Sequence, residues 1–140
     1  MAASDHLSGV QFDNSGERTV RIGDRTFPSI DNGDYQNHGR TWMRSAMIPM
    51  ENGGLANVEH DTDTGRVNVA APRHQLGVGG NPNYRHLFEY HPQGKDLTTP
   101  EQVHGVLDEM SHQHLSQDSV QTNRNWMDVV HRVKDDERGG

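Results

Sequence analysis

Two arginine-histidine pairs are the residues best suited to chemistry. Arg73-His74 and Arg85-His86 stand on either side of a glycine-rich stretch, "LGVGGNPN". A histidine can move a proton near neutral pH, and an arginine can stabilise a developing anion. A metal-independent, nuclease-like effector or toxin domain would use such a set. The alternative is that these residues form the polar faces of strands, and we favour it because no catalytic motif surrounds them.

Ten histidines are the most unusual feature of the composition, and imidazole also ligates metals. No two of them stand four residues apart, so no helix face presents two imidazoles to one ion. His112 and His114 would point about 200° apart on a helix, whereas His86 and His91 would face opposite sides of a strand. We therefore predict no metal site and no cofactor, with most histidines at the surface.

The stretch "EHDTDTG", residues 59 to 65, offers several oxygen and nitrogen donors. A calcium loop of the EF-hand type has glycine at its sixth position, but Gly65 is only the fifth residue counted from Asp61, and no glutamate stands at the twelfth. Apolar residues alternate before and after the stretch, ending at Val58 and resuming at Val67. The pattern predicts a hairpin loop between two paired strands rather than a metal site.

The composition limits the class of protein. A chain of 140 residues with 30% hydrophobic residues and a mean hydropathy of -0.96 indicates one domain with a modest core. A net charge of -7 without a basic cluster disfavours nucleic acid as a partner. The absence of cysteine excludes disulfides and thiol catalysis.

Targeting features are also absent from the sequence. It has no run of about 18 apolar residues that could span a membrane. Its first residues, "MAASDHLSGVQFD", lack the basic and apolar regions of a signal peptide. A cytoplasmic protein, a virion component and a domain of a larger secreted chain all remain open.

The first two thirds of the chain read as short strands joined by turns. "TVRIGDRTF" predicts a hairpin over Gly23-Asp24, and Asn32-Gly33 predicts a second hairpin turn. A strand is expected over residues 41–43, followed by a short helix over residues 45–50 that ends at Asn52-Gly53-Gly54. "RHLFEYH", residues 85 to 91, predicts a further strand.

The last third is predicted to be helical. Thr99-Pro100-Glu101-Gln102 is a capping box with proline at the first helical position, which predicts a helix over about residues 100–112. A second helix is expected over about residues 118–134. The apolar stripes of the two helices consist of Val103, Val106, Leu107 and Met110, and of Val120, Trp126, Met127, Val130 and Val133.

Together these elements predict an α+β fold, a small antiparallel sheet of hairpins over about residues 10–91 packed by two C-terminal helices. We expect a single domain over residues 10–134. Residues 1–9 and 135–140 are polar and carry no periodic apolar face, so we expect disordered tails there.

The stretch from residue 39 to residue 69 resembles the copper-amine-oxidase N-terminal-like repeat, also called the stalk domain. The residues that fit its G-R-T strand and its V-E-W-D, turn and strand pattern are Gly39, Arg40, Thr41, Val58, Glu59, Asp61, Thr64, Val67 and Val69. Residues 20–28 also suit the opening hairpin of the family, so the resemblance covers residues 20–69 loosely. It departs from the family at Pro49, at His60 in place of the tryptophan, and in lacking proline-arginine after the first strand. The resemblance implies a non-catalytic appendage of cell-surface or phage-associated proteins. Despite the family name it does not imply copper, because the repeat has no copper ligands that map onto this sequence.

The sequence therefore favours a non-enzymatic structural or binding module, such as one for phage or cell-envelope assembly. Its partner would be another protein or a second copy of the chain, and no membrane span is expected. Candidate binding residues are the aromatic side chains Trp42, Tyr84 and Tyr90. The alternative is the small histidine-dependent effector or toxin domain, and its catalytic residues would be Arg73, His74, Arg85 and His86.

Overall fold

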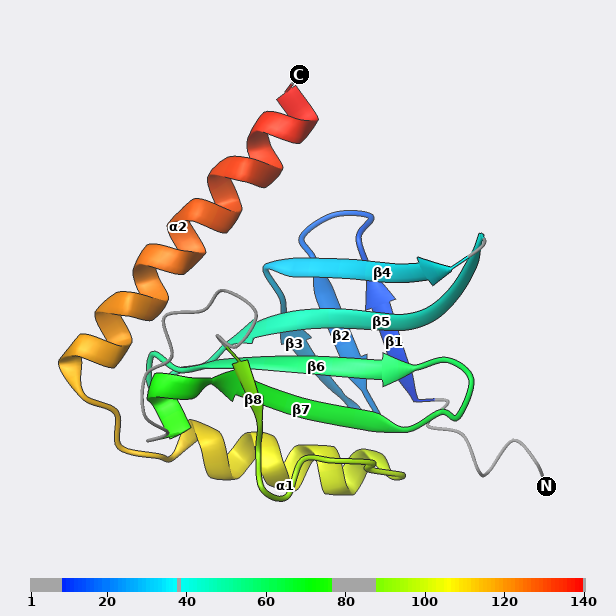
Figure 1. Cartoon of the computed structure of the whole chain (residues 1–140), viewed down its shortest axis with the longest axis horizontal. Helices are drawn as coiled ribbons and strands as arrows, with labels where there is room; N and C mark the ends of the chain where they lie inside the picture. Colours follow the sequence, from blue (N-terminus) through cyan, green and yellow to red (C-terminus); the bar gives the residue numbers. More distant parts are fainter. Residues whose placement is uncertain (1–8, 38, 77–87, 140) are drawn as a thin grey trace.

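The computed structural model describes residues 9–37, 39–76 and 88–139. It confirms the predicted α+β class: two antiparallel sheets, ordered β1-β2-β3 and β4-β5-β6-β7-β8, come first, and the helices occupy the C-terminal part (Figure 1). The strands are β1 (Val10–Asp13), β2 (Thr19–Ile22), β3 (Arg25–Pro28), β4 (Asp31–Asn37), β5 (Arg40–Pro49), β6 (Leu55–Asp61), β7 (Val67–Pro72) and β8 (Phe88–Tyr90). The helices are the short 3₁₀ helix η2 (Arg73–Leu76), α1 (Pro100–Ser111) and α2 (Gln117–Gly139).

Two predicted hairpins are confirmed. Gly23-Asp24 joins β2 to β3, and Gly23 has the positive φ of 64° that such a loop requires. The second hairpin joins β6 to β7. Its turn is held by the Asp61 carboxylate, which accepts hydrogen bonds from the backbone N–H groups of Asp63 (2.8 Å) and Thr64 (3.1 Å). Gly65 then closes the turn with a φ of 76°, so the "EHDTDTG" stretch is a loop, as predicted.

The predicted turn at Asn32-Gly33 is wrong. Both residues lie inside β4, where Asn32 pairs with Ala46 and Gly33 pairs with Ser45. The long strand β5 offers a continuous ladder of backbone partners, so tertiary pairing overrides the local preference of this dipeptide for a turn. The chain direction reverses later, between β4 and β5.

The predicted short helix over residues 45–50 is also wrong, because β5 continues to Pro49. Ala46 and Ile48 alternate into the core, which is the period of a strand and not of a helix. Pro49 is tolerated because it ends the strand, where a missing N–H is least costly. The next residue, Met50, begins the turn by donating to the Gly54 carbonyl oxygen at 2.8 Å.

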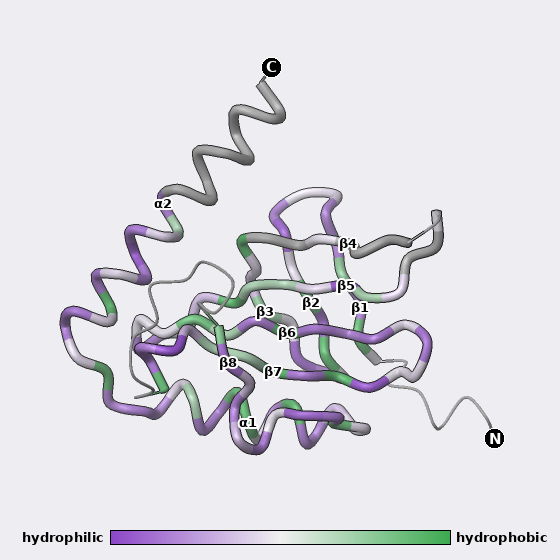
Figure 2. The backbone as a smooth tube through the Cα atoms, viewed as in Figure 1, coloured by the Kyte–Doolittle hydropathy of each residue, from purple (hydrophilic) through white to green (hydrophobic). Residues whose placement is uncertain are grey.

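One apolar core unites the two sheets and α1. Val20 and Ile22 from the first sheet and Val58 and Val69 from the second belong to the same buried cluster as Leu107 of α1. The predicted inner face of α1 is confirmed, since all four of its apolar residues are buried. In Figure 2 hydrophobic segments lie along the strands and α1, whereas the loop between β6 and β7 is hydrophilic.

The second helix, α2, is longer than predicted. It ends at Gly139 rather than near residue 134, so residues 135–139 are helical instead of forming a tail. Of the predicted N-terminal tail, residues 1–8 lie outside the described residues. Figure 1 shows α2 extending away from the two sheets. No helix in the described ranges is long and apolar enough to cross a membrane.

The capping box of α1 is formed as the sequence predicts, and it can be tested. The Thr99 hydroxyl oxygen accepts from the Gln102 backbone N–H, and the Gln102 side chain accepts from the Thr99 backbone N–H, both at 3.2 Å. We expect Thr99→Ala to lower the free energy of unfolding by about 1 kcal/mol because one backbone donor loses its partner. Urea unfolding followed by circular dichroism measures this. Thr26→Ala, on an exposed strand position, is the control and should change it by less than about 0.5 kcal/mol.

Candidate functional site

The first arginine-histidine pair forms η2, directly after β7. The Arg73 guanidinium donates to the Glu89 carboxylate of β8 at 2.7 Å. The His74 ring contacts α2, with its Nδ1 at 3.1 Å from the Ser119 hydroxyl and its ring edge-on to Trp126. Arg73 therefore links η2 to β8, and His74 links η2 to α2. Arg85-His86 and Tyr84 lie outside the described residues.

His74 has the environment of a structural histidine. Its Nε2 is buried and has no hydrogen-bond partner. Burial lowers the pKa of His74 below its usual value, and the Asn123 side chain opposes this change. The contacts of His74 with Ser119 and Trp126 join η2 to α2.

The two predicted aromatic binding residues in the described ranges do not form one surface. Trp42 lies in a β-bulge of β5, since Tyr35 pairs with Met43 and Gln36 pairs with Thr41. Tyr90 lies on β8, and two strands separate β8 from β5. Each side chain is 38% exposed. Because they lie on different strands, they could contact a partner only at two separate places.

Tyr90 is held by neighbours on its own sheet. Its hydroxyl donates to the Glu59 carboxylate at 2.8 Å, and the Lys95 ammonium lies 5.5 Å from its ring centroid. Burial, followed by the hydrogen bond and the charge of Glu59, raises the pKa of Tyr90 to about 12. Tyr90 therefore stays a neutral phenol at neutral pH.

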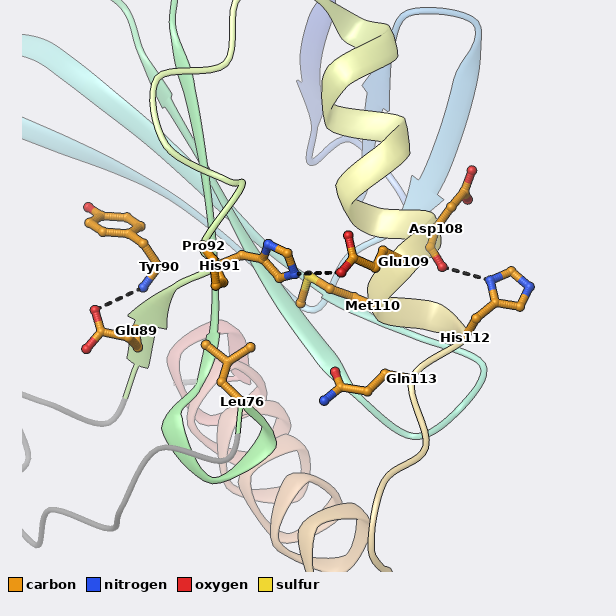
Figure 3. A pocket seen from close by; sticks show the side chains of 10 residues that line it. All are labelled: Leu76, Glu89, Tyr90, His91, Pro92, Asp108, Glu109, Met110, His112 and Gln113. Carbon is orange, nitrogen blue, oxygen red and sulfur yellow. Dashed lines mark hydrogen bonds and ion pairs between the residues drawn. The ribbon is translucent and has the colours of Figure 1, made fainter.

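A groove of about 730 Å³ lies between β8 with its following loop and the C-terminal half of α1 (Figure 3). Both apolar and polar side chains line it, and three of them are carboxylates. Its lining consists of Leu76, Glu89, Tyr90, His91, Pro92, Asp108, Glu109, Met110, His112 and Gln113. Only Tyr90 among these was predicted as a leading site residue. Neither Arg73 nor His74 lines the groove, so the structure does not bring the predicted catalytic pair to it.

His91 is the most buried polar side chain of the groove, at 7% exposure. Its Nδ1 accepts a hydrogen bond from the Gln93 backbone N–H at 3.1 Å, which assigns the ring proton to Nε2. Nε2 faces the Glu109 carboxylate at 3.7 Å (Figure 3). The groove therefore contains a neutral imidazole beside an ionised carboxylate.

Metal binding receives no geometric support in the described ranges. Within residues 9–37, 39–76 and 88–139, no group of three or more histidine or acidic side chains could hold an ion. His112 is the C-cap of α1. Its Nδ1 lies 2.7 Å from the Asp108 carbonyl oxygen.

No protein-family model, curated protein or solved structure matches this chain. The resemblance of residues 20–69 to the stalk domain stays a prediction from the sequence. Function must therefore be inferred from the geometry of the groove.

A second groove, of about 570 Å³, lies on the opposite side of α1, between that helix and the strands β3 and β5. It shares Asp108 and His112 with the first groove. The Arg25 guanidinium donates to the Asp108 carboxylate at 3.1 Å. The C-terminal half of α1 therefore borders both grooves.

The lowered pKa of the partly buried His74 predicts a pH dependence of stability. Because its pKa is lowered in the folded chain, the unfolded chain takes up the proton first as the pH falls below about 6.5. We expect the free energy of unfolding to be lower at about pH 5.5 than at about pH 7.5, two conditions on either side of the usual histidine pKa. Urea unfolding at both conditions measures the difference.

The variant His74→Gln should reduce that difference, since it removes the group that titrates. His114→Gln, an exposed position after α1, is the matched control and should keep it. A full pH effect in His74→Gln would show that other groups cause it.

Proposed function

We propose that this chain is a non-enzymatic binding module that holds a partner protein in the groove between β8 and α1. The observation that supports this most is the groove itself, which combines apolar walls with a few fixed polar groups. Its volume of about 730 Å³ is enough to take side chains of a partner, since pockets of about 300–1,000 Å³ enclose whole drug-sized molecules. Its walls are β8 and α1, which follow one another in the chain, and both stand on the apolar core.

The shape of the groove is fixed before any partner binds. Met110, in the α1 wall, is buried at its side chain. Gln113 donates from its side chain to the Gln75 carbonyl oxygen at 2.9 Å, which fixes the end of the same wall. Such preorganisation favours affinity because little conformational entropy is lost on binding.

The histidine-dependent alternative receives little support from the described residues. Arg73 pairs with Glu89 at 2.7 Å, and this carboxylate offsets its charge. His74 is desolvated and contacts α2. Among the described residues, the lining of the groove includes no serine, threonine or lysine.

A role in assembly, such as in a phage or cell envelope, is the form of binding that we propose. The acidic composition and the stalk-like pattern support it, together with a groove suited to a protein segment. In this role the partner is a segment of another protein, because the groove is open and bounded by a helix and a strand.

A peptide selection tests the proposal. We expect a random peptide library, panned against the immobilised domain, to yield peptides that lose binding to Glu109→Arg, which reverses a charge inside the groove. Glu101→Arg is the matched control, because Glu101 lies on the same helix but outside the groove. Peptides that bind wild type and Glu101→Arg equally, but not Glu109→Arg, would support the groove as the binding site.

Two results would contradict the proposal. The first is a selection in which no peptide is enriched. The second is enrichment of peptides whose affinity is the same for wild type and Glu109→Arg, since these bind elsewhere. Circular dichroism of each variant verifies that the fold is retained.

A further inference from the structure

We infer that the groove selects a basic side chain, a lysine or an arginine, presented by the partner protein. This inference rests on the proposed function and specifies the chemistry of the occupant. It follows from the charges of the lining, the pairing of each charge and the apolar floor beside them.

The described lining of the groove carries three carboxylates and neither lysine nor arginine. Two of the three are already paired with arginines from outside the lining. Glu89 accepts from Arg73 at 2.7 Å, and Asp108 accepts from Arg25 at 3.1 Å. The two carboxylates, Glu89 and Asp108, lie on opposite sides of the groove (Figure 3).

Glu109 lies between these two carboxylates and has no lysine or arginine partner in the described part of the chain. It faces Nε2 of His91 at 3.7 Å, a separation that exceeds hydrogen-bond length. His91 is neutral when Nδ1 accepts from the Gln93 backbone N–H, so it does not cancel the charge of Glu109. The centre of the groove therefore offers an unneutralised negative charge.

Hydrophobic surface accompanies this charge. Leu76 and Met110 line the groove below Glu109, and Pro92 lies on the β8 side. The long alkyl stems of lysine and arginine pack on such surface while their charged ends reach a polar group. Gln113, fixed by its hydrogen bond to Gln75, contributes an amide oxygen as a further acceptor.

The same features favour a side chain over a free metal ion. Glu109 and His91 provide only two of the ligands that an ion requires, and no third joins them in the described ranges. A bare ion would also gain nothing from Leu76 and Met110. A basic residue on a protein segment uses both the charge and the apolar floor.

Titration of the ¹⁵N-labelled domain with blocked peptides tests the inference. The probes are glycine-flanked peptides with one central arginine, lysine, citrulline or norleucine. We expect the arginine and lysine peptides to shift the backbone resonances of His91, Glu109 and Gln113. Citrulline and norleucine should not, because they keep the length and lose the charge.

Charge-neutral variants identify the carboxylate responsible. Glu109→Gln should weaken binding of the arginine peptide about three- to fivefold, the size expected for a partly exposed ion pair, since the Glu109 side chain is 59% exposed. Glu101→Gln removes the same charge from the same helix outside the groove, so its affinity should equal that of wild type.

Three results would overturn the inference. These are equal binding of the citrulline and arginine peptides, equal weakening by Glu101→Gln, and identical shifts with spermidine or magnesium ion alone.

The peptide selection described above separates this inference from the proposed function. If the library yields groove-binding peptides without basic residues, this inference fails and the proposed function stands. If the library yields no groove-binding peptide, the proposed function itself fails.

Discussion

The buried side chain of Gln75 is the contact on which the arrangement of the groove depends. It is only 3% exposed and makes two hydrogen bonds to the backbone of Leu55, accepting from its N–H at 3.0 Å and donating to its carbonyl at 3.1 Å. Asn123 of α2 donates to Gln75 at 3.1 Å and to the Gly53 carbonyl oxygen at 3.0 Å. A buried amide without partners would cost about 1–3 kcal/mol, so these bonds specify one arrangement of β6, η2 and α2.

The end of α1 belongs to the same junction. The Gln75 backbone carbonyl accepts from the Gln113 side chain at 2.9 Å, and the Asn52 side chain donates to the Met110 carbonyl oxygen at 2.8 Å. Leu76 follows Gln75 directly. A polar network therefore positions three residues of the groove wall, Leu76, Met110 and Gln113.

The features predicted correctly are those whose conformation is set by residues close by in the sequence. The capping box of α1, the Gly23-Asp24 turn and the loop at Gly65 follow from local chemistry, and each is found in the structure. Asn32-Gly33 and the segment 45–50 were mispredicted because their conformations are set by pairing between β4 and β5. Local preference is weaker than an extended ladder of backbone hydrogen bonds.

The candidate site was less accessible to prediction than the fold. The pair Arg73-His74 was visible in the sequence, but its partners Glu89 and Ser119 come from β8 and α2. Likewise, nothing in the sequence places His91 beside Glu109, because only the packing of α1 against the sheet brings them together. Contacts of this kind need the three-dimensional arrangement and have no local pattern.

Native-state hydrogen exchange on the variant Gln75→Met tests most directly whether this one side chain links the segments. If Gln75 links these segments, protection of backbone amides against exchange should fall together at Leu55, Gln113 and Val120. The strands β1, β2 and β3 should keep the protection of the wild type. A loss confined to Leu55 would contradict this link, because Gln75 would then serve only its own strand contact.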